Sequence, residues 1–198
     1  YNQWAELGNV GWSWADVRPY FINSERNQRG ASDYHGDSGP MGVCDVKQPN
    51  RLAEAFVQAC LQAGYPRNQD FNGTNQEGAG FYQLTTWNGF RSSSATAYLK
   101  PARHRSGLHI VTDAQVEQIK FEDNHARSVV YRRGNTEYTI LAQREIILSA
   151  GSVQSPQLLQ LSGVGEACCL QQFGIPVVKN LPDVGRNLQD HLQVRLIH

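Results

Sequence analysis

The most constraining feature of the sequence is an apolar run that passes directly into a turn of small residues. Residues 145–148 (Glu-Ile-Ile-Leu) are almost wholly apolar, and residues 149–151 (Ser-Ala-Gly) follow at once. An apolar run of this length predicts a strand buried on both faces of a partly parallel sheet. A helix is expected immediately afterwards, with Ser155 as its N-cap and Pro156 at its first position. The sequence therefore predicts a strand–turn–helix unit.

The turn of this unit consists of residues with little or no side chain. Ala150 and Gly151 stand at the expected carboxyl end of the strand, which is the edge where open α/β sheets bind cofactors. Backbone can approach a flat ligand closely at such residues. Gly163 is suited to the left-handed conformation that ends a short helix. Because strand–turn–helix units occur throughout α/β proteins, this unit alone does not indicate a function.

A series of β-rich runs leads up to this unit. Their β-branched and aromatic residues, separated by polar turns, predict strands. The runs are 108–111, 115–121, 128–131, 138–142 and 145–148. We therefore expect a β-meander that feeds the buried strand.

The first half of the chain predicts helices joined by irregular segments. Ser13 is followed three positions later by Asp16, which is the pattern of a capping box, and a helix is expected over residues 14–24. Asn50 can cap a second helix, and Gly64 marks its end. Composition further predicts a loop over 27–43, a strand over 81–87 and a helix over 91–99.

The charge and hydropathy of the chain exclude several classes of partner. Its 198 residues include 18 Lys plus Arg and 18 Asp plus Glu, so no net field attracts nucleic acid or an anionic membrane. No apolar run approaches the ~20 residues that cross a bilayer. The expected ligands are small molecules. The chain does not begin with methionine, and we expect it to be a piece of a longer or processed protein.

The cysteines predict neither a disulfide framework nor a metal site. Cys168 and Cys169 are adjacent, which is too close for an ordinary disulfide, and no C-x-x-C spacing is present. We therefore expect reduced thiols, a cytoplasmic location and no bound metal.

Residues 151–165 resemble the second signature of the glucose-methanol-choline (GMC) oxidoreductase family. The agreement extends from Gly151 through Ser155 and Pro156 to residues 162–165 (Ser-Gly-Val-Gly). Other family landmarks are at 2–25, 35–36 with 39–40, 70–73, 91 with 94–99, and 181–191. The resemblance covers essentially the whole chain, and within the family the sequence is most similar to bacterial choline dehydrogenases and related FAD-dependent alcohol dehydrogenases.

The resemblance implies a fold class and a domain organisation. The fold class is α+β (mixed α/β): part of a Rossmann-like FAD-binding domain with a β-meander, plus part of an α+β substrate-binding domain. Residues 1–95 are assigned mainly to the substrate domain and its connecting loops, and residues 96–198 mainly to the FAD domain. The chain is expected to be an internal segment of the parent protein, for which peripheral membrane association stays open.

The resemblance also implies FAD as cofactor and a small-molecule alcohol as substrate. Members of the family pass hydride from a CH–OH group to the flavin, whose chemistry carries the redox step. Val116 carries over as a backbone contact to the adenine ring, although a buried strand valine is the ordinary interpretation. Ala150 and Gly151 carry over as the close-approach turn beside the cofactor. Ser155 is a further candidate whose hydroxyl can instead be engaged as a helix cap.

Two parts of the family pattern are missing from this sequence. No G-x-G-x-x-G fingerprint occurs, and the family's catalytic histidine lies beyond the position corresponding to His198. We therefore assign no catalytic residue. Asp190 and His191 are interpreted as a structural turn, because neighbours in sequence usually point apart. His35 and the remaining histidines are interpreted as ordinary surface or loop residues.

Two interpretations stay open for the chain. In the first, it is a segment of a FAD-dependent, choline-like alcohol dehydrogenase, with either a quinone or oxygen as electron acceptor. In the second, it is a non-catalytic folded fragment without bound flavin. Because the missing elements leave strand edges and apolar surface uncovered, we expect self-association of the isolated chain.

Overall fold

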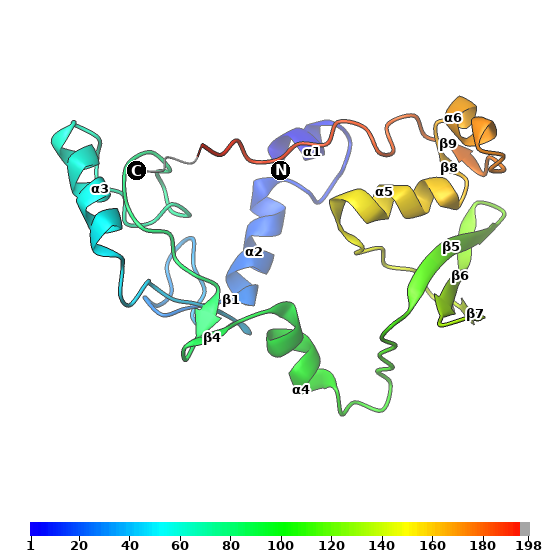
Figure 1. Cartoon of the computed structure of the whole chain (residues 1–198), viewed down its shortest axis with the longest axis horizontal. Coiled ribbons are helices and arrows are strands. Elements are labelled where there is room, and N and C mark those ends of the chain that lie inside the picture. The colour runs from blue at the N-terminus through cyan, green and yellow to red at the C-terminus, as the bar shows by residue number, and fades with distance from the viewer. Residues whose placement is uncertain (195–198) are drawn as a thin grey trace. The chain divides into compact units, whose positions relative to one another are not determined.

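The chain forms two compact units, Tyr1–His109 and Ile110–His198. The structure, a computed structural model, describes residues 1–194. Both units combine helices with strands (Figure 1), which confirms the expected mixed α and β class. The division falls later in the chain than the expected boundary at residue 95. The assignment of the two units to a substrate domain and a FAD domain stays a prediction.

The first unit consists of helices joined by long coil segments. Its helices are α1 (Asn2–Glu6), α2 (Trp14–Ser24), α3 (Arg51–Gln62), the π-helix η1 (Ala95–Leu99) and α4 (Lys100–Ala102). Its strands are β1 (Glu25–Asn27), β2 (Met41–Val43), β3 (Thr86–Trp87) and β4 (Phe90–Arg91). β1 pairs in parallel with β2, and β3 pairs antiparallel with β4. Ladders this short satisfy few backbone groups, so side-chain hydrogen bonds must hold much of the coil.

Two helices of the first unit begin where the sequence predicts. At α2, the Ser13 hydroxyl accepts a hydrogen bond from the Asp16 amide at 3.3 Å, and the Asp16 carboxylate accepts one from the Ser13 amide at 3.1 Å. This reciprocal pair is the expected capping box. At α3, the Asn50 side chain accepts a hydrogen bond from the Leu52 amide at 2.8 Å. The predicted helices over 14–24 and after Asn50 are therefore confirmed.

Other predictions for this unit are wrong in part. Of the expected strand over 81–87, only Thr86–Trp87 lies in a ladder, and the expected loop over 27–43 contains β2. The expected helix over 91–99 begins only at Ala95. Arg91 lies instead in β4. The Ser93 amide donates to the Thr96 hydroxyl at 2.8 Å, and the Thr96 amide donates to the Ser93 hydroxyl at 3.3 Å. These reciprocal bonds satisfy amides at the start of a helix, so the helical turn begins after Ser93.

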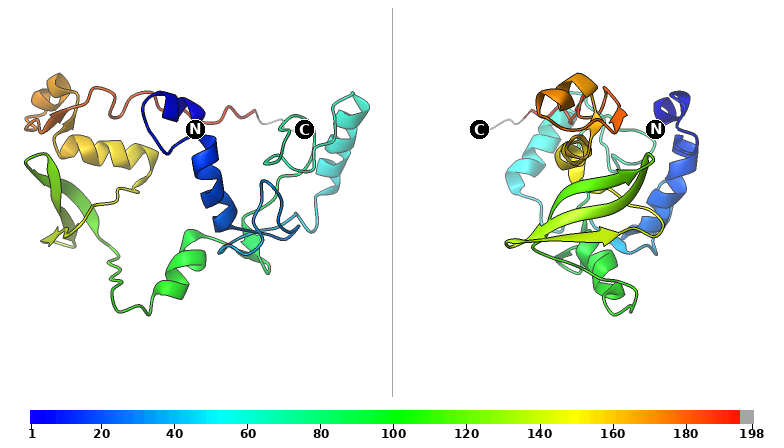
Figure 2. Two further views of the ribbon diagram at one scale, coloured as in Figure 1. Left: turned by 180° about the vertical axis from the view of Figure 1, so that it is seen from behind. Right: turned by 90° about the vertical axis from the view of Figure 1, so that its right-hand side faces the viewer.

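The second unit contains a three-stranded antiparallel sheet covered by a helix. The sheet has the order β5 (Gln115–Glu122), β6 (His125–Arg133), β7 (Thr136–Leu141), which confirms a meander in this part of the chain. The helices are α5 (Gly151–Leu161) and α6 (Ala167–Gln172), and β8 (Val164–Gly165) pairs in parallel with β9 (Lys179–Asn180). The right-hand view of Figure 2 shows the three strands side by side beneath α5.

A buried serine joins α5 to the edge of this sheet. Ser162, only 3% exposed, follows the last residue of α5. Its hydroxyl accepts a hydrogen bond from the Ile119 amide of β5 at 2.8 Å and donates one to the Leu158 carbonyl at 2.6 Å. An edge amide that would otherwise be buried without a partner is thereby satisfied. The apolar core around this contact includes Ile119, Val130, Leu158, Val164 and Leu170.

The buried strand expected over 145–148 is absent from the structure, as is the strand expected over 108–111. No described residue forms a ladder or an isolated bridge with 145–148, and the Ile147 side chain is 79% exposed. A strand exists only where a neighbouring segment offers backbone donors and acceptors. The apolar pattern of 145–148 indicated burial, but within residues 1–194 no strand pairs with this segment.

The start of α5 also differs from the prediction. The helix begins at Gly151 with Ala150 as its N-cap, so Ser155 and Pro156 lie inside it. The predicted N-cap role of Ser155 is therefore wrong. Its hydroxyl instead accepts a hydrogen bond from the backbone amide of Ala150 at 3.1 Å. Ser155 thus satisfies an amide at the start of α5 that has no partner within the helical backbone. The predicted end is confirmed, because Gly163 follows α5 in the left-handed region with φ +87°.

Candidate functional site

A cavity of about 230 Å³ lies between the first residues of β5 and one face of α5. Its lining comes from Ala114, Gln115 and Val116 on one side and from Ala150, Gln154, Gln157, Leu158 and Leu161 on the other. Val116 and Ala150, two of the four residues predicted to contact the cofactor, therefore line the same cavity although they are far apart in the sequence. This convergence makes the cavity the candidate site.

The other two predicted residues shape the turn beside the cavity without lining it. Gly151 has φ +92°, and the position of a Cβ there meets no atom within 4 Å. The positive φ therefore favours glycine at this position, although the space next to it is open. Ser155 holds the Ala150 amide through its hydroxyl. Together they fix the backbone path of the turn from which Ala150 reaches the cavity.

The walls of the cavity are uncharged. Aliphatic groups alternate with the amide side chains of Gln115, Gln154 and Gln157, which can both donate and accept hydrogen bonds. The side-chain Nε2 of Gln115 donates to the backbone carbonyl of Val116 at 3.1 Å. Pockets for drug-sized ligands occupy roughly 300–1,000 Å³, so this smaller cavity suits a single ring system. A flat, neutral heteroaromatic ring such as adenine fits the donor set, and the complete FAD molecule exceeds it.

A β-bulge places Val116 at the cavity wall. Val116 pairs with Tyr131 and Gln118 pairs with Val130, so Glu117 is an extra residue in β5. The Glu117 carboxylate accepts two hydrogen bonds from the Arg132 guanidinium, at 2.7 and 3.2 Å. These bonds, with the negative charge of Glu117, raise the pKa of Arg132 above its usual range. The bidentate pair holds the bulge against β6.

The first unit contains a buried histidine between two carboxylates. His35 is 7% exposed, with its Nδ1 atom 2.8 Å from Glu25 Oε2 and its Nε2 atom 2.9 Å from Asp70 Oδ2. Burial acts to lower the pKa of His35, but hydrogen bonds to both carboxylates and their charges outweigh it and raise the pKa. His35 lies in a loop, as interpreted from the sequence, but it is buried and paired with two carboxylates, so its interpretation as a surface residue is wrong. Its partners lie too far away in the sequence to have been recognised there.

Further hydrogen bonds extend from this histidine across the coil of the first unit. Asn27 Nδ2 donates to Glu25 Oε1 at 3.0 Å and to Gln83 Oε1 at 2.9 Å. Gln83 Nε2 donates in turn to Asp45 Oδ1 at 3.0 Å, and Arg29 forms an ion pair with Asp45 at 2.6 Å. The hydrogen bond from Arg29 leads the interactions that hold the pKa of Asp45 below its usual range. A polar network thus links β1 to the coil segments that carry Asp45 and Gln83.

The adjacent pair Asp190 and His191 forms a local backbone contact. Asp190 Oδ1 accepts a hydrogen bond from the His191 amide at 2.8 Å, and both residues are exposed. His198 lies outside the described residues. Within residues 1–194, no group of three or more His, Cys, Asp or Glu residues could hold a metal ion. Over the same residues, no helix has the length and apolar character needed to cross a membrane.

Comparison with known proteins gives consistent matches over nearly the whole chain. Residues 1–193 match the family model described as GMC oxidoreductase. An oxygen-dependent choline dehydrogenase of Paraburkholderia phymatum is 48% identical over 197 residues, which cover 98% of this chain and 34% of that protein.

Two solved structures share the fold. Pyridoxine 4-oxidase from Mesorbium loti has a TM-score of 0.85 and 30% identity, over 92% of this chain and 36% of that one. A FAD-dependent oxidoreductase from Chaetomium thermophilum has a TM-score of 0.84 and 30% identity, over 92% of this chain and 34% of that one. The chain spans about a third of the length of these relatives. On the strength of the family match over residues 1–193, the chain belongs to the GMC oxidoreductase family.

Proposed function

We propose that the protein to which this chain belongs is a FAD-dependent dehydrogenase that oxidises the CH–OH group of a choline-like alcohol. Membership of the GMC oxidoreductase family and the 48% identity to a choline dehydrogenase support this proposal. The observation that carries it is the cavity lined by both Val116 and Ala150. Bound FAD would supply the hydride acceptor.

The contribution of this chain is to hold the adenine end of the cofactor. Val116 and Ala150 both line the cavity, and so do Gln154 and Gln157 of α5. Backbone groups at Val116 and side-chain amides can bond the edge of a ring, while aliphatic groups cover its faces. Gly151 and Ser155 keep the turn in place.

We further propose that the isolated chain does not oxidise alcohols. The sequence contains no G-x-G-x-x-G fingerprint, which elsewhere brings the backbone against the pyrophosphate at a helix N-terminus. The chain also spans only 34% of the choline dehydrogenase that it resembles. Binding of the adenine end and turnover are therefore separate properties, and the first can be measured without the second.

Titration of the purified chain with FAD, followed by flavin fluorescence, tests the proposed site. We expect saturable binding that Ala150→Leu weakens by about tenfold or more, since one lost ring contact of ~1.4 kcal/mol has that effect. Ser152→Leu adds the same side chain to an exposed position of α5 outside the cavity lining and should leave the affinity unchanged. Absence of saturable binding, or equal loss in both variants, would contradict the assignment of the cavity to the cofactor.

Self-association of the isolated chain is a separate proposal. Leu141 at the end of β7 is 77% exposed and Ile147 is 79% exposed, so apolar surface lies next to an edge strand that another copy can pair with. Sedimentation velocity should show dimers or larger species whose proportion rises with concentration. A compact monomer of 22.1 kDa at all concentrations would argue against this proposal.

A further inference from the structure

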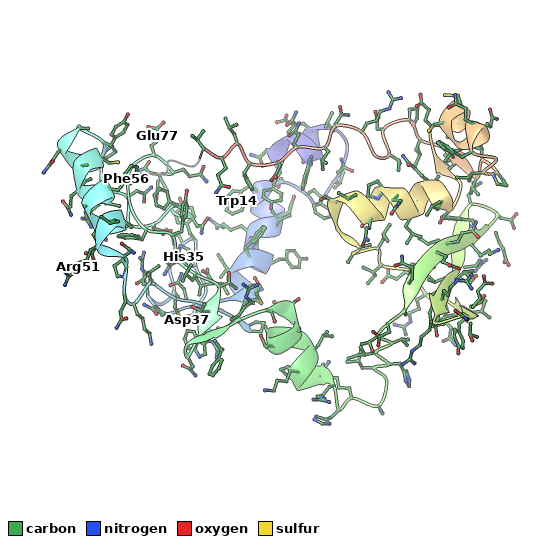
Figure 3. The ribbon with its side chains drawn as sticks, in the orientation of Figure 1. Trp14, His35, Asp37, Arg51, Phe56 and Glu77 are labelled. Atoms are coloured by element: carbon green, nitrogen blue, oxygen red, sulfur yellow. The ribbon has the colours of Figure 1, made fainter. Side chains whose placement is uncertain are left out.

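We propose that His35 is a proton-dependent tie: in its charged form it holds the loop of residues 68–76 against β1, and in its neutral form it releases one of its two carboxylate partners. The tie belongs to the first unit, whereas the residues that line the cavity proposed for the cofactor belong to the second. Figure 3 shows His35 within the coil-rich part of this unit.

The chemistry of the imidazole carries the inference. Both ring nitrogens of His35 lie within hydrogen-bond distance of carboxylate oxygens, 2.8 Å from Glu25 and 2.9 Å from Asp70. A neutral imidazole has one N–H donor, whereas the imidazolium has two. An ionised carboxylate only accepts hydrogen bonds. Only the charged ring can therefore donate to both partners at once, and loss of its proton turns one contact into a repulsion between lone pairs.

The Asp70 carboxylate connects the tie to the conformation of the loop. Its Oδ2 atom faces His35, while its Oδ1 atom accepts a hydrogen bond from the Asn72 amide at 3.0 Å. The Asp70 amide donates to Asn68 Oδ1 at 2.8 Å, and Asn68 Nδ2 donates to the Asn75 carbonyl at 2.8 Å. Movement of Asp70 therefore disturbs contacts at both ends of the loop.

The loop and the tie border the same cavity. A space of about 710 Å³ is lined by Glu25 and His35 on one side and by Asn72, Gly73, Thr74 and Gln76 on the other. The rest of its lining is mainly aromatic and apolar. Since the tie joins the two sides, the protonation state of His35 sets how firmly this wall of the cavity is held.

The charged and titratable groups around His35 favour its charged form. Glu25 in β1 and Asp70 in the loop contact the ring directly, and the uncharged Asn27 side chain lies 3.3 Å from Nδ1. Asp45 and Arg29 are reached only through Asn27 and Gln83, and they neutralise one another in an ion pair. The environment is thus dominated by two negative charges and raises the pKa of His35.

The sign of the pH dependence follows from that direction. A folded-state pKa above the unfolded value means that the stabilisation is complete below the unfolded pKa and is lost as pH rises through the folded pKa. The loop should therefore be held fully below the ordinary histidine pKa of 6.5 and should loosen as pH rises through the folded-state pKa of His35. Between the two pKa values, the equilibrium for opening increases by up to about tenfold per pH unit, because one proton is released.

Nuclear magnetic resonance of the imidazole nitrogens in the intact chain tests the tie directly. We expect His35 to titrate above the ordinary histidine pKa of 6.5, and Asp70→Asn to shift this titration downward. Titration of His35 at or below that ordinary value, or an unchanged His35 in Asp70→Asn, would overturn the proposal. These measurements do not require replacement of the histidine.

Hydrogen exchange of loop amides supplies the second readout. Protection factors of the amides in residues 70–76 should fall as pH rises through the titration of His35 in the unsubstituted chain. His35→Gln should abolish this pH dependence, and the control His104→Gln should retain it. Persistence of the same pH dependence in His35→Gln would show that another group controls the loop and would overturn the proposal.

Discussion

Replacement of Gly36 by alanine is expected to lower the free energy of unfolding of the first unit by about 3 kcal/mol, the upper part of the range for overpacking a filled site. Gly36 is buried, and a Cβ placed on it would collide with the Ile22 carbonyl oxygen and lie 2.9 Å from the Glu25 carbonyl oxygen. Both obstacles are backbone atoms at the junction of α2 and β1, which cannot rotate away. Because residue 36 directly follows His35, the change also displaces the backbone next to His35.

Unfolding in urea followed by tryptophan fluorescence measures this effect, because all four tryptophans lie in the first unit. Gly107→Ala is the matched control, since its Cβ would meet no atom within 4 Å and its backbone is not in the left-handed region. That control should be neutral or stabilising by ~0.5 kcal/mol through reduced entropy of the unfolded chain. Equal midpoints for the two variants would contradict the close approach at Gly36.

Replacement of Gly163 by alanine is expected to destabilise the second unit by about 2–5 kcal/mol, the sum of left-handed strain and overpacking. Gly163 has φ +87°, and a Cβ there would collide with the Pro176 carbonyl oxygen and lie 2.9 Å from a methyl group of Val178. The Gly163 carbonyl also accepts hydrogen bonds from the Val178 and Lys179 amides, at 2.8 and 3.1 Å. The substitution therefore separates α5 from the β9 segment.

Gly174→Ala separates the two causes of this loss. Gly174 is also in the left-handed region, with φ +68°, but a Cβ there would meet no atom within 4 Å. The free energy of unfolding of Gly174→Ala should fall only by the strain component, about 1–2 kcal/mol. The difference between the two variants, measured by urea unfolding with far-UV circular dichroism, then reports the collision alone. Equal losses would mean that the segment around Pro176 moves aside without cost.

Features set by neighbouring residues were predictable from the sequence. The capping box of Ser13 and Asp16, the Asn50 cap and the terminating Gly163 each depend on groups within a few positions of one another. The meander was also predictable, because polar turns separate its β-rich runs. The resemblance of residues 151–165 to a family signature, an inference from the sequence as well, agrees with the family match over residues 1–193.

Features set by residues far apart in the sequence were decided only by the tertiary structure. The apolar run 145–148 indicated burial but could not supply a pairing strand, and Ser155 could be read as a cap until the helix was found to start at Gly151. His35 acquires its charge environment from Glu25 and Asp70, which no local pattern connects. Val116 and Ala150 share a cavity because a bulged strand packs against α5. Local hydrogen bonds decide where elements begin and end, whereas cavities and pKa values depend on which elements pack together.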